Sequence, residues 1–183
     1  MGYVTNNLKK GEIMHKDNHV TTFMLATAND KHEILSLYRQ AIGSDGCTWS
    51  MDYPNEEILD GDLERDALFV LKNHKNEIIG AISIDADMAV ENLPCWSKEL
   101  KPGAELARLV VKESCRNQGI ARILLASAME ELKKRQYKSV HFLVSKTHER
   151  ALRSYAKLKF EKKGETDLFG GDWWCYEKAL EKN

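Results

Sequence analysis

The chain has 183 residues, of which 43% are hydrophobic and 30% are charged. That length predicts a single domain with a substantial core. The 27 Lys and Arg residues nearly balance the 28 Asp and Glu residues, and the net charge is −1. This balance argues against a strongly basic nucleic-acid-binding protein.

Membrane and export segments are not expected. The longest stretch without Asp, Glu, Lys or Arg, residues 18–29, is shorter and more polar than the ~20 apolar residues that a bilayer span needs. None of the four cysteines forms a C-x-x-C pair, and the histidines show no ligand spacing, so we expect no metal site. We expect reduced thiols in a cytoplasmic protein that has neither a membrane nor a nucleic acid as partner.

In chain order, residues 1–20 are polar and without periodicity, which predicts a flexible extension before one domain over residues 21–183. Apolar and β-branched runs predict strands at 20–28, 67–72, 77–85, 104–112, 139–145, 160–166 and 173–178. Helical spacing of apolar residues predicts helices at 31–42, 55–63, 118–136 and 148–159. The order β-α-α-β-β-β-α-β-α-β-β predicts an α/β (α+β) domain with a mixed central sheet flanked by helices.

Residues 105–125 carry the most informative pattern: a buried strand, the turn RNQGIA at 116–121, and a long helix. The first N–H groups of a helix lack internal partners and sit at the positive end of its dipole. Gly119 and Ala121 leave room for a ligand to approach the backbone, and Arg116 and Arg122 flank the turn. The pattern indicates a site for a pyrophosphate-sized anion, with a simple tight connection as the alternative. It is neither a P-loop nor the G-x-G-x-x-G dinucleotide motif.

The turn RNQGIA resembles the R/Q-x-x-G-x-G/A signature of the GCN5-related N-acetyltransferases. The strand LARLVV resembles the fourth strand of that family, and residues 148–160 resemble its N-x-x-A-x-x-x-Y-x-K-x-G-F helix. The element order is similar from about residue 20 to residue 180. His148, Lys159 and Ala121 depart from the family pattern, where Asn, Gly and Gly are usual. Lys159 is therefore expected in a left-handed helix cap, at a cost of ~1 kcal/mol.

The resemblance implies acetyl-CoA as the acyl donor and an amine as the acceptor, with no metal. It places the pantetheine arm beside the strand at 109–111, as a peptide adds to a sheet edge, with a backbone N–H near Leu109 or Val110 polarising the thioester carbonyl. It places the pyrophosphate on the amides of the turn. The implied cofactor-binding residues are Leu109, Val110, Val111, Arg116, Asn117, Gln118, Gly119, Ile120, Ala121, Arg122 and His148.

Acyl transfer to an amine needs one group to remove a proton and another to supply one. Tyr155 aligns with the tyrosine of the family helix and is the expected acid; a core aromatic is the alternative. Glu105, at the start of the cofactor strand, is the expected base, since a carboxylate among apolar residues would have a raised pKa. The alternative for Glu105 is a surface side chain, and Asp85 is a weaker candidate for the base.

The acceptor pocket of this fold is usually built from the early helices and their connecting loop, which contains Trp49, Asp52 and Tyr53. An acid beside aromatic rings suits a cationic amine, although plain loop packing explains the same residues. We therefore predict an acetyl-CoA-dependent N-acetyltransferase that acts on a primary amine of a small molecule or peptide. A non-catalytic acyl-CoA sensor and a binder of another nucleotide are the alternatives. A homodimer is left open.

Overall fold

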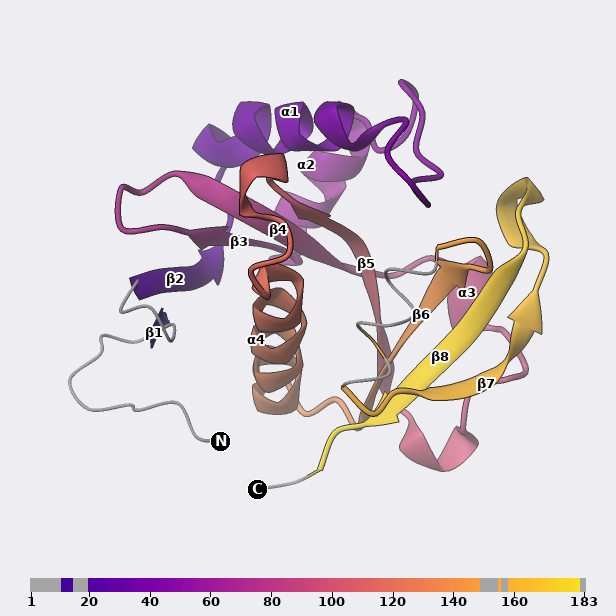
Figure 1. The fold of residues 1–183 in the computed structure, drawn as a ribbon. Coiled ribbons are helices and arrows are strands. Elements are labelled where there is room, and N and C mark those ends of the chain that lie inside the picture. The colour runs from indigo at the N-terminus through magenta and orange to yellow at the C-terminus, as the bar shows by residue number, and fades with distance from the viewer. Residues whose placement is uncertain (1–10, 15–19, 149–154, 156–157, 182–183) are drawn as a thin grey trace.

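The computed structural model describes residues 11–14, 20–148, 155 and 158–181. In this part of the chain eight strands form one sheet in the order β1-β2-β3-β4-β5-β6-β8-β7 (Figure 1). Neighbouring strands are antiparallel except for β5 and β6, which are parallel. The strands are β1 (Glu12–Met14), β2 (Val20–Leu25), β3 (Leu68–Lys72), β4 (Ile78–Asp85), β5 (Gly103–Val111), β6 (Ser139–Ser145), β7 (Glu161–Thr166) and β8 (Trp173–Ala179).

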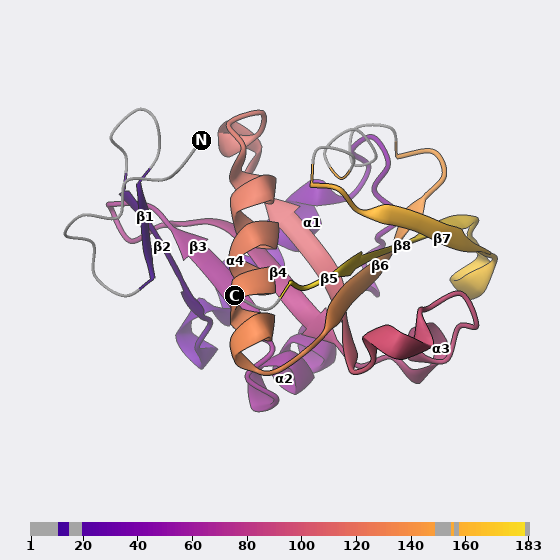
Figure 2. The ribbon, with the colours of Figure 1, turned by 90° about the horizontal axis from the view of Figure 1, so that it is seen from below.

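Helices cover both faces of the sheet. α1 (Lys31–Ala41) and α2 (Glu56–Glu64) lie on one face, and α4 (Ile120–Lys134) lies on the other, as Figures 1 and 2 show from two directions. Ile34, Tyr38 and Leu59 bury the first interface, whereas Leu124 and Leu132 bury the second. The prediction of a mixed sheet flanked by helices is therefore confirmed.

Capping side chains fix where the first two helices begin. Asn55 accepts a hydrogen bond from the backbone N–H of Ile58 at 3.0 Å, so α2 starts within a residue of its prediction. The Asp30 carboxylate reaches back to the backbone N–H and hydroxyl of Thr27, both at 2.8 Å, and closes a short 3-10 turn before α1. Because this turn begins at Ala28, the strand predicted at 20–28, which is β2, ends at Leu25.

Three further elements were not predicted. Residues 12–14 of the expected flexible extension form β1, which pairs with β2 at the sheet edge. Between β4 and β5, where no element was predicted, lie α3 (Met88–Glu91) and a 3-10 turn at Lys98–Leu100. Most residues of the helix expected at 148–159 lie outside the described part of the chain. Tyr155 is helical, and Lys159 has the predicted left-handed backbone, with φ of 58°. No helix of the described residues is long and apolar enough to cross a bilayer.

The sheet splits between its two parallel strands. β5 and β6 pair only at Gly103–Ser139, Ala104–Val140 and Glu105–His141. Beyond residue 105, β5 continues along β4 while β6 continues along β8. The edge of β5 over residues 106–111 therefore faces an opening rather than another strand, in the part of the chain that the structure describes.

Candidate active site

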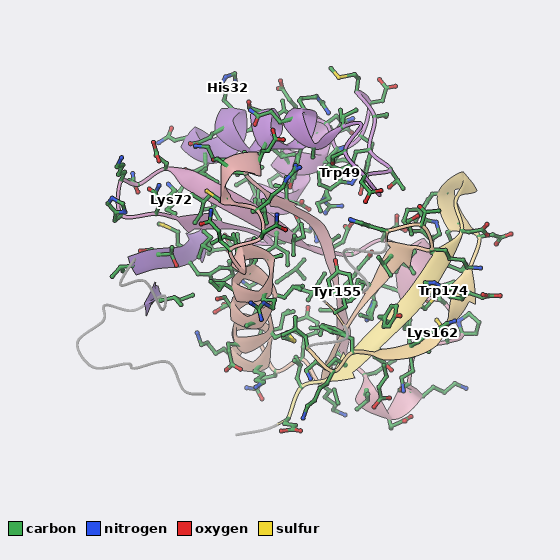
Figure 3. All side chains as sticks on the ribbon, viewed as in Figure 1. His32, Trp49, Lys72, Tyr155, Lys162 and Trp174 are labelled. Carbon is green, nitrogen blue, oxygen red and sulfur yellow. The ribbon has the colours of Figure 1, made fainter. Side chains whose placement is uncertain are left out.

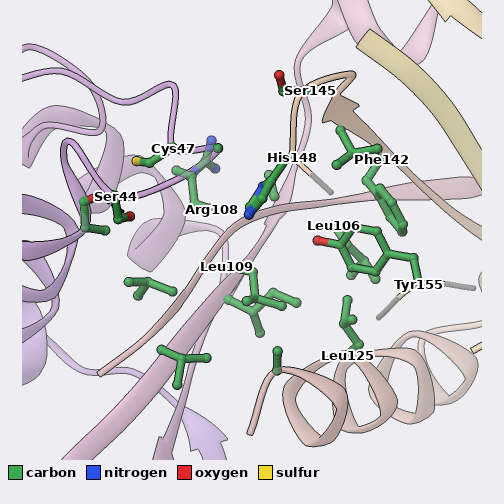
Figure 4. Close-up of a pocket in the computed structure, with 18 of the residues that line it drawn as sticks. Ser44, Cys47, Leu106, Arg108, Leu109, Leu125, Phe142, Ser145, His148 and Tyr155 are labelled. Atoms are coloured by element: carbon green, nitrogen blue, oxygen red, sulfur yellow. Dashed lines mark hydrogen bonds between the residues drawn. The ribbon is translucent and has the colours of Figure 1, made fainter. Parts of the chain in front are cut away.

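A cavity of about 540 Å³ fills the split in the sheet. One wall is β5 from Leu106 to Val111, and the other is β6 from Phe142 to Ser145 (Figure 4). The turn before α4 closes one end, and the loop after α1 forms the rim. A cleft with an unpaired strand edge can bind an extended amide-containing ligand by adding it to that edge.

The turn before α4 has the geometry that an anion requires. Gly119 adopts φ of +83°, a left-handed conformation that costs an L-residue about 1–2 kcal/mol. No side chain caps the helix there. The Arg122 guanidinium lies over Gly119, where a Cβ would stand 3.1 Å from its Nη2 atom. Arg116 is tied to the strand end through the Val111 carbonyl at 3.3 Å. The backbone N–H groups at the start of α4 and the side chains of Arg116 and Arg122 thus lie together at one end of the cavity.

Nearly all the residues predicted to bind the cofactor border this cavity. The exception is Gln118, whose exposed side chain donates to the Ser114 carbonyl at 3.1 Å. His148 also lines the cavity and packs against Gly46, where a Cβ would lie 2.3 Å from the imidazole. His148 therefore joins the loop after α1 to the end of β6 across the cavity mouth. The lining residues are Leu109, Val110, Val111, Arg116, Asn117, Gly119, Ile120, Ala121, Arg122 and His148.

Tyr155 forms part of the β6 wall. Its ring lies 4.4 Å from that of Phe142, and its hydroxyl points into the cavity (Figure 4). Trp49 stands on the opposite side, on the loop after α1 (Figure 3). Burial raises the pKa of Tyr155 to about 12, so the phenol keeps its proton throughout the neutral range.

A buried arginine that the sequence did not reveal shapes β5. Ile82 of β4 faces two β5 residues, Arg108 and Leu109, which form a bulge where Arg108 has φ of +49°. The guanidinium makes two hydrogen bonds to Asp62 of α2, at 2.8 and 3.0 Å. It also donates to Asp85 and to the Tyr53 hydroxyl, the latter at 3.2 Å. The bulge turns Leu109 and Val111 toward the α4 side of the sheet.

The ion pairs of Arg108 with Asp62 and Asp85 are costly to desolvate, but each charge has an opposite partner. Burial raises the pKa of Asp62, although Arg108 and a hydrogen bond from Ser83 oppose that shift. Burial acts to lower the pKa of Arg108, but the hydrogen bond to Asp85 and the charge of Asp62 outweigh it, and its pKa lies above the ordinary value. Asp85 has a lowered pKa because its bonds to Arg108 and to the Ala86 amide outweigh its own desolvation. The hydrogen bonds and opposite charges of this network therefore hold the side chains of Arg108, Asp62 and Asp85 in one arrangement.

Glu105 lies beside the network, on the same face of the sheet. It is 7% exposed, and its Oε2 atom has no hydrogen-bond partner among the described residues. Burial, and then the negative charge of Asp85, raise the pKa of Glu105 to about 8, against the weaker opposing effect of Arg108. The raised pKa was predicted, whereas the burial of Glu105 differs from the alternative of a surface side chain. Glu105 does not line the 540 Å³ cavity, although Leu106 next to it does.

The predicted acceptor residues occupy three different settings. Trp49 borders the cavity and meets Tyr38 edge-on at 5.0 Å. Tyr53 is 40% exposed and is held by Arg108, at the edge of the network. Asp52 is exposed, does not line the cavity, and has its backbone N–H bonded to the Ser50 hydroxyl at 3.2 Å. The structure thus brings Trp49 and Tyr53 to the site but leaves Asp52 at the outer rim.

Sequence reasoning missed Arg108, Asp62 and His141 as part of this region. A charged residue inside the apolar run LARLVV was the available signal for Arg108, since a lone buried cation requires a partner. Asp62 stands within a short amphipathic helix and carries no local signal.

The family model described as Acetyltransferase (GNAT) family matches residues 31–160. The chain belongs to this family of acetyltransferases.

Solved structures of the family share the fold. An N-acetyltransferase from Staphylococcus aureus Mu50 has a TM-score of 0.69 at 19% identity, over 88% of this chain and 99% of that one. The ribosomal-protein-S18-alanine N-acetyltransferase from Escherichia coli has a TM-score of 0.67 at 16% identity, over 89% and 96% of the two chains. Ard1 from Thermoplasma volcanium has a TM-score of 0.69 at 14% identity, over 88% and 99%. No curated protein matches the chain significantly.

Proposed function

We propose that this protein is an acetyl-CoA-dependent N-acetyltransferase that moves an acetyl group directly to a primary amine of a small molecule or peptide. One observation carries the proposal: the open edge of β5 ends at an uncapped helix start flanked by two arginines. The cytoplasm is the proposed compartment, because all four cysteines are free thiols.

The residues of the cleft fit coenzyme A. The amides at the start of α4, with Arg116 and Arg122, would hold the pyrophosphate, and the edge of β5 at Leu109–Val111 would hold the pantetheine amides. When bound, acetyl-CoA supplies an acetyl group activated as a thioester. The size of the cavity and the open edge of β5 support an elongated ligand over a compact nucleotide.

Two side chains would manage the protons. Tyr155 keeps a proton on its hydroxyl inside the cavity, where it can be given to a departing thiolate. Glu105 binds a proton with a pKa of about 8 and, although it does not line the cavity, can take one through water from an arriving ammonium group at its Oε2 atom. The pKa values of these groups are thus suited to an acid and a base that work near neutral pH.

The ionised form of Glu105 supports an amine as the acceptor. Asp62 and Asp85 are ion-paired with Arg65 and Arg108, so ionised Glu105 is the carboxylate of this region without a cation partner among the described residues. Such a carboxylate attracts an ammonium group and repels another carboxylate. The name of the Escherichia coli structural neighbour adds an alanine of a ribosomal protein to the acceptors that merit testing.

The test follows thiol release from acetyl-CoA across a panel of amino acids, polyamines, aminoglycosides and short peptides, alongside calorimetric titration with acetyl-CoA. We expect cofactor binding and turnover of at least one amine. Absence of binding at millimolar acetyl-CoA would refute the proposal. Binding without turnover on any amine would favour the sensor module instead, and equal competition by ADP would favour a general nucleotide binder.

A further inference from the structure

We propose that His141 and Glu91 form a proton exit from Glu105 to solvent, through a second cavity that is separate from the acyl-transfer cleft. This inference rests on the proposed function, in which Glu105 takes a proton from the acceptor. It assigns His141 and Glu91 a role as positioning and relay residues, since neither lines the 540 Å³ cavity.

The need for an exit follows from the burial of Glu105. A base must return its proton to solvent before the next turnover, and Glu105 is 7% exposed. Glu105 does not line the large cavity, and bound cofactor, acceptor or product would block that side until the products leave. A route on the side of Glu105 away from the cleft would let the proton leave without waiting for product release.

The strand register brings a row of titratable side chains to one face of the sheet. Asp85 pairs with Glu105, Glu105 pairs with His141, and His141 pairs with Glu177, across β4, β5, β6 and β8. Laterally paired residues point to the same face. This is the face opposite α4, because the alternate β6 residues Val140, Phe142 and Val144 belong to the core beneath α4. His141 is thus the β6 neighbour of Glu105.

His141 is buried, oriented and connected to solvent. Its Nε2 atom lies 3.0 Å from Oε1 of Glu91, and its ring stacks on Trp96 at 4.6 Å. The His141 side chain is 2% exposed and that of Glu91 is 28% exposed. A carboxylate accepts, so the imidazole donates through Nε2–H, and in the neutral imidazole the lone pair of Nδ1 is then available. Nδ1 faces Gly103, where a Cβ would stand only 3.1 Å away, so the missing side chain keeps this nitrogen accessible.

A second cavity of about 150 Å³ lies at this imidazole. Its wall includes Gly103, His141, Glu91, Trp96 and Glu177. A cavity of that volume with polar walls accommodates water. Water there can contact the His141 imidazole. Glu105 does not border this cavity, and its link to His141 is their pairing on the neighbouring strands β5 and β6.

Four charged groups act on Glu105: Asp85 on β4, Arg108 on β5, Asp87 at the start of α3 and Glu91 within α3. Three of these four groups are acidic, so a departing positive charge is stabilised along the route.

On the far side of His141, Glu177 is occupied elsewhere. Its carboxylate accepts from the Ser97 hydroxyl at 2.6 Å and from the Ser97 amide, and Lys163 lies 3.8 Å away. Glu91 is therefore the carboxylate that can receive a proton from the imidazole.

The transfer moves one proton and changes no other bond. The proton leaves the Glu105 carboxyl group and binds Nδ1 of His141, directly or through one water. The Nε2 proton passes to the carboxylate of Glu91, which releases it to solvent. Proton exchange with water in the second cavity returns the imidazole to its Nε2–H form. Glu105 is ionised again and ready for the next acceptor.

The first test needs no substrate. Imidazole ¹⁵N spectra of the free protein should show His141 as the Nε2–H form, with an Nδ1 shift that changes near pH 8, where Glu105 titrates. Glu105→Gln should remove that change, and Glu130→Gln, an exposed pair with Lys133 on α4, should leave it intact. A proton on Nδ1 with none on Nε2, or an Nδ1 chemical shift that is the same in wild type and Glu105→Gln at every pH, would overturn the relay.

The second test uses the fastest acceptor of the amine panel. His141→Gln keeps a donor toward Glu91 but cannot carry a proton, so its first turnover should match wild type while kcat falls about 10²-fold, the low end of acid–base effects. Added imidazole should restore kcat in the variant and leave wild type unchanged. Glu91→Gln should show the same pattern. A kcat equal to that of wild type, or a loss that imidazole does not restore, would contradict the relay. If no amine reacts, the proposed function fails, and the spectra still decide on the relay.

Discussion

Replacing Glu105 by Gln should stabilise the protein at high pH. Its pKa rises from an ordinary 4.5 to about 8 on folding, so the folded state holds the proton more tightly than the unfolded state. The contribution of Glu105 to stability is fully present below pH 4.5 and is lost as the pH rises to 8. At about 1.4 kcal/mol per pH unit, the loss amounts to at most about 5 kcal/mol above pH 8. Glutamine resembles the protonated carboxyl group and titrates in neither state.

Urea unfolding of wild type and Glu105→Gln at pH 5 and pH 9 measures this difference. The variant should match wild type within about 1 kcal/mol near pH 5 and exceed it by several kcal/mol at pH 9. Glu130→Gln, at an exposed position, serves as the control and should show no such gain. Equal stability of Glu105→Gln and wild type at pH 9 would refute the desolvation argument for Glu105.

Further predictions concern catalysis, the ion-pair network and the turn. The kcat/KM of wild type should rise with pH up to about 8, as Glu105 ionises, and Glu105→Gln should lose that limb; a profile that is unchanged in the variant would assign the base elsewhere. Tyr155→Phe should lower kcat by about 10²-fold while calorimetric affinity for acetyl-CoA holds, and unchanged turnover would remove Tyr155 from the mechanism. Asp62→Ala leaves the charge of Arg108 buried and should cost about 3–5 kcal/mol in urea unfolding; a cost near that of an exposed pair, below about 1 kcal/mol, would contradict the network. Gly119→Ala should cost about 1–2 kcal/mol and weaken acetyl-CoA binding, so retention of full affinity would argue against the turn as the pyrophosphate site.

Local patterns in the sequence predicted most of the elements and the strand–turn–helix around Gly119. Helix α4 and strand β6 follow from apolar periodicity, because each buries one regular set of side chains. Lys159 takes the left-handed conformation expected of it, since backbone sterics act within a residue or two. Strand β1 was missed because a three-residue edge strand gains its stability from its pairing with β2 rather than from its own sequence.

What only the tertiary structure decided is the meeting of residues that are distant in sequence. Asp62 and Arg108 are 46 positions apart and His141 and Glu91 are 50 apart, so no local pattern could pair them. The burial of Glu105, which sets its pKa, depends on β4, α3 and the bulge together. The sequence by itself determined the family, the strand–turn–helix and the candidate acid. The environment of Glu105, the candidate base, depended on long-range packing, because desolvation and charge act through space and not along the chain.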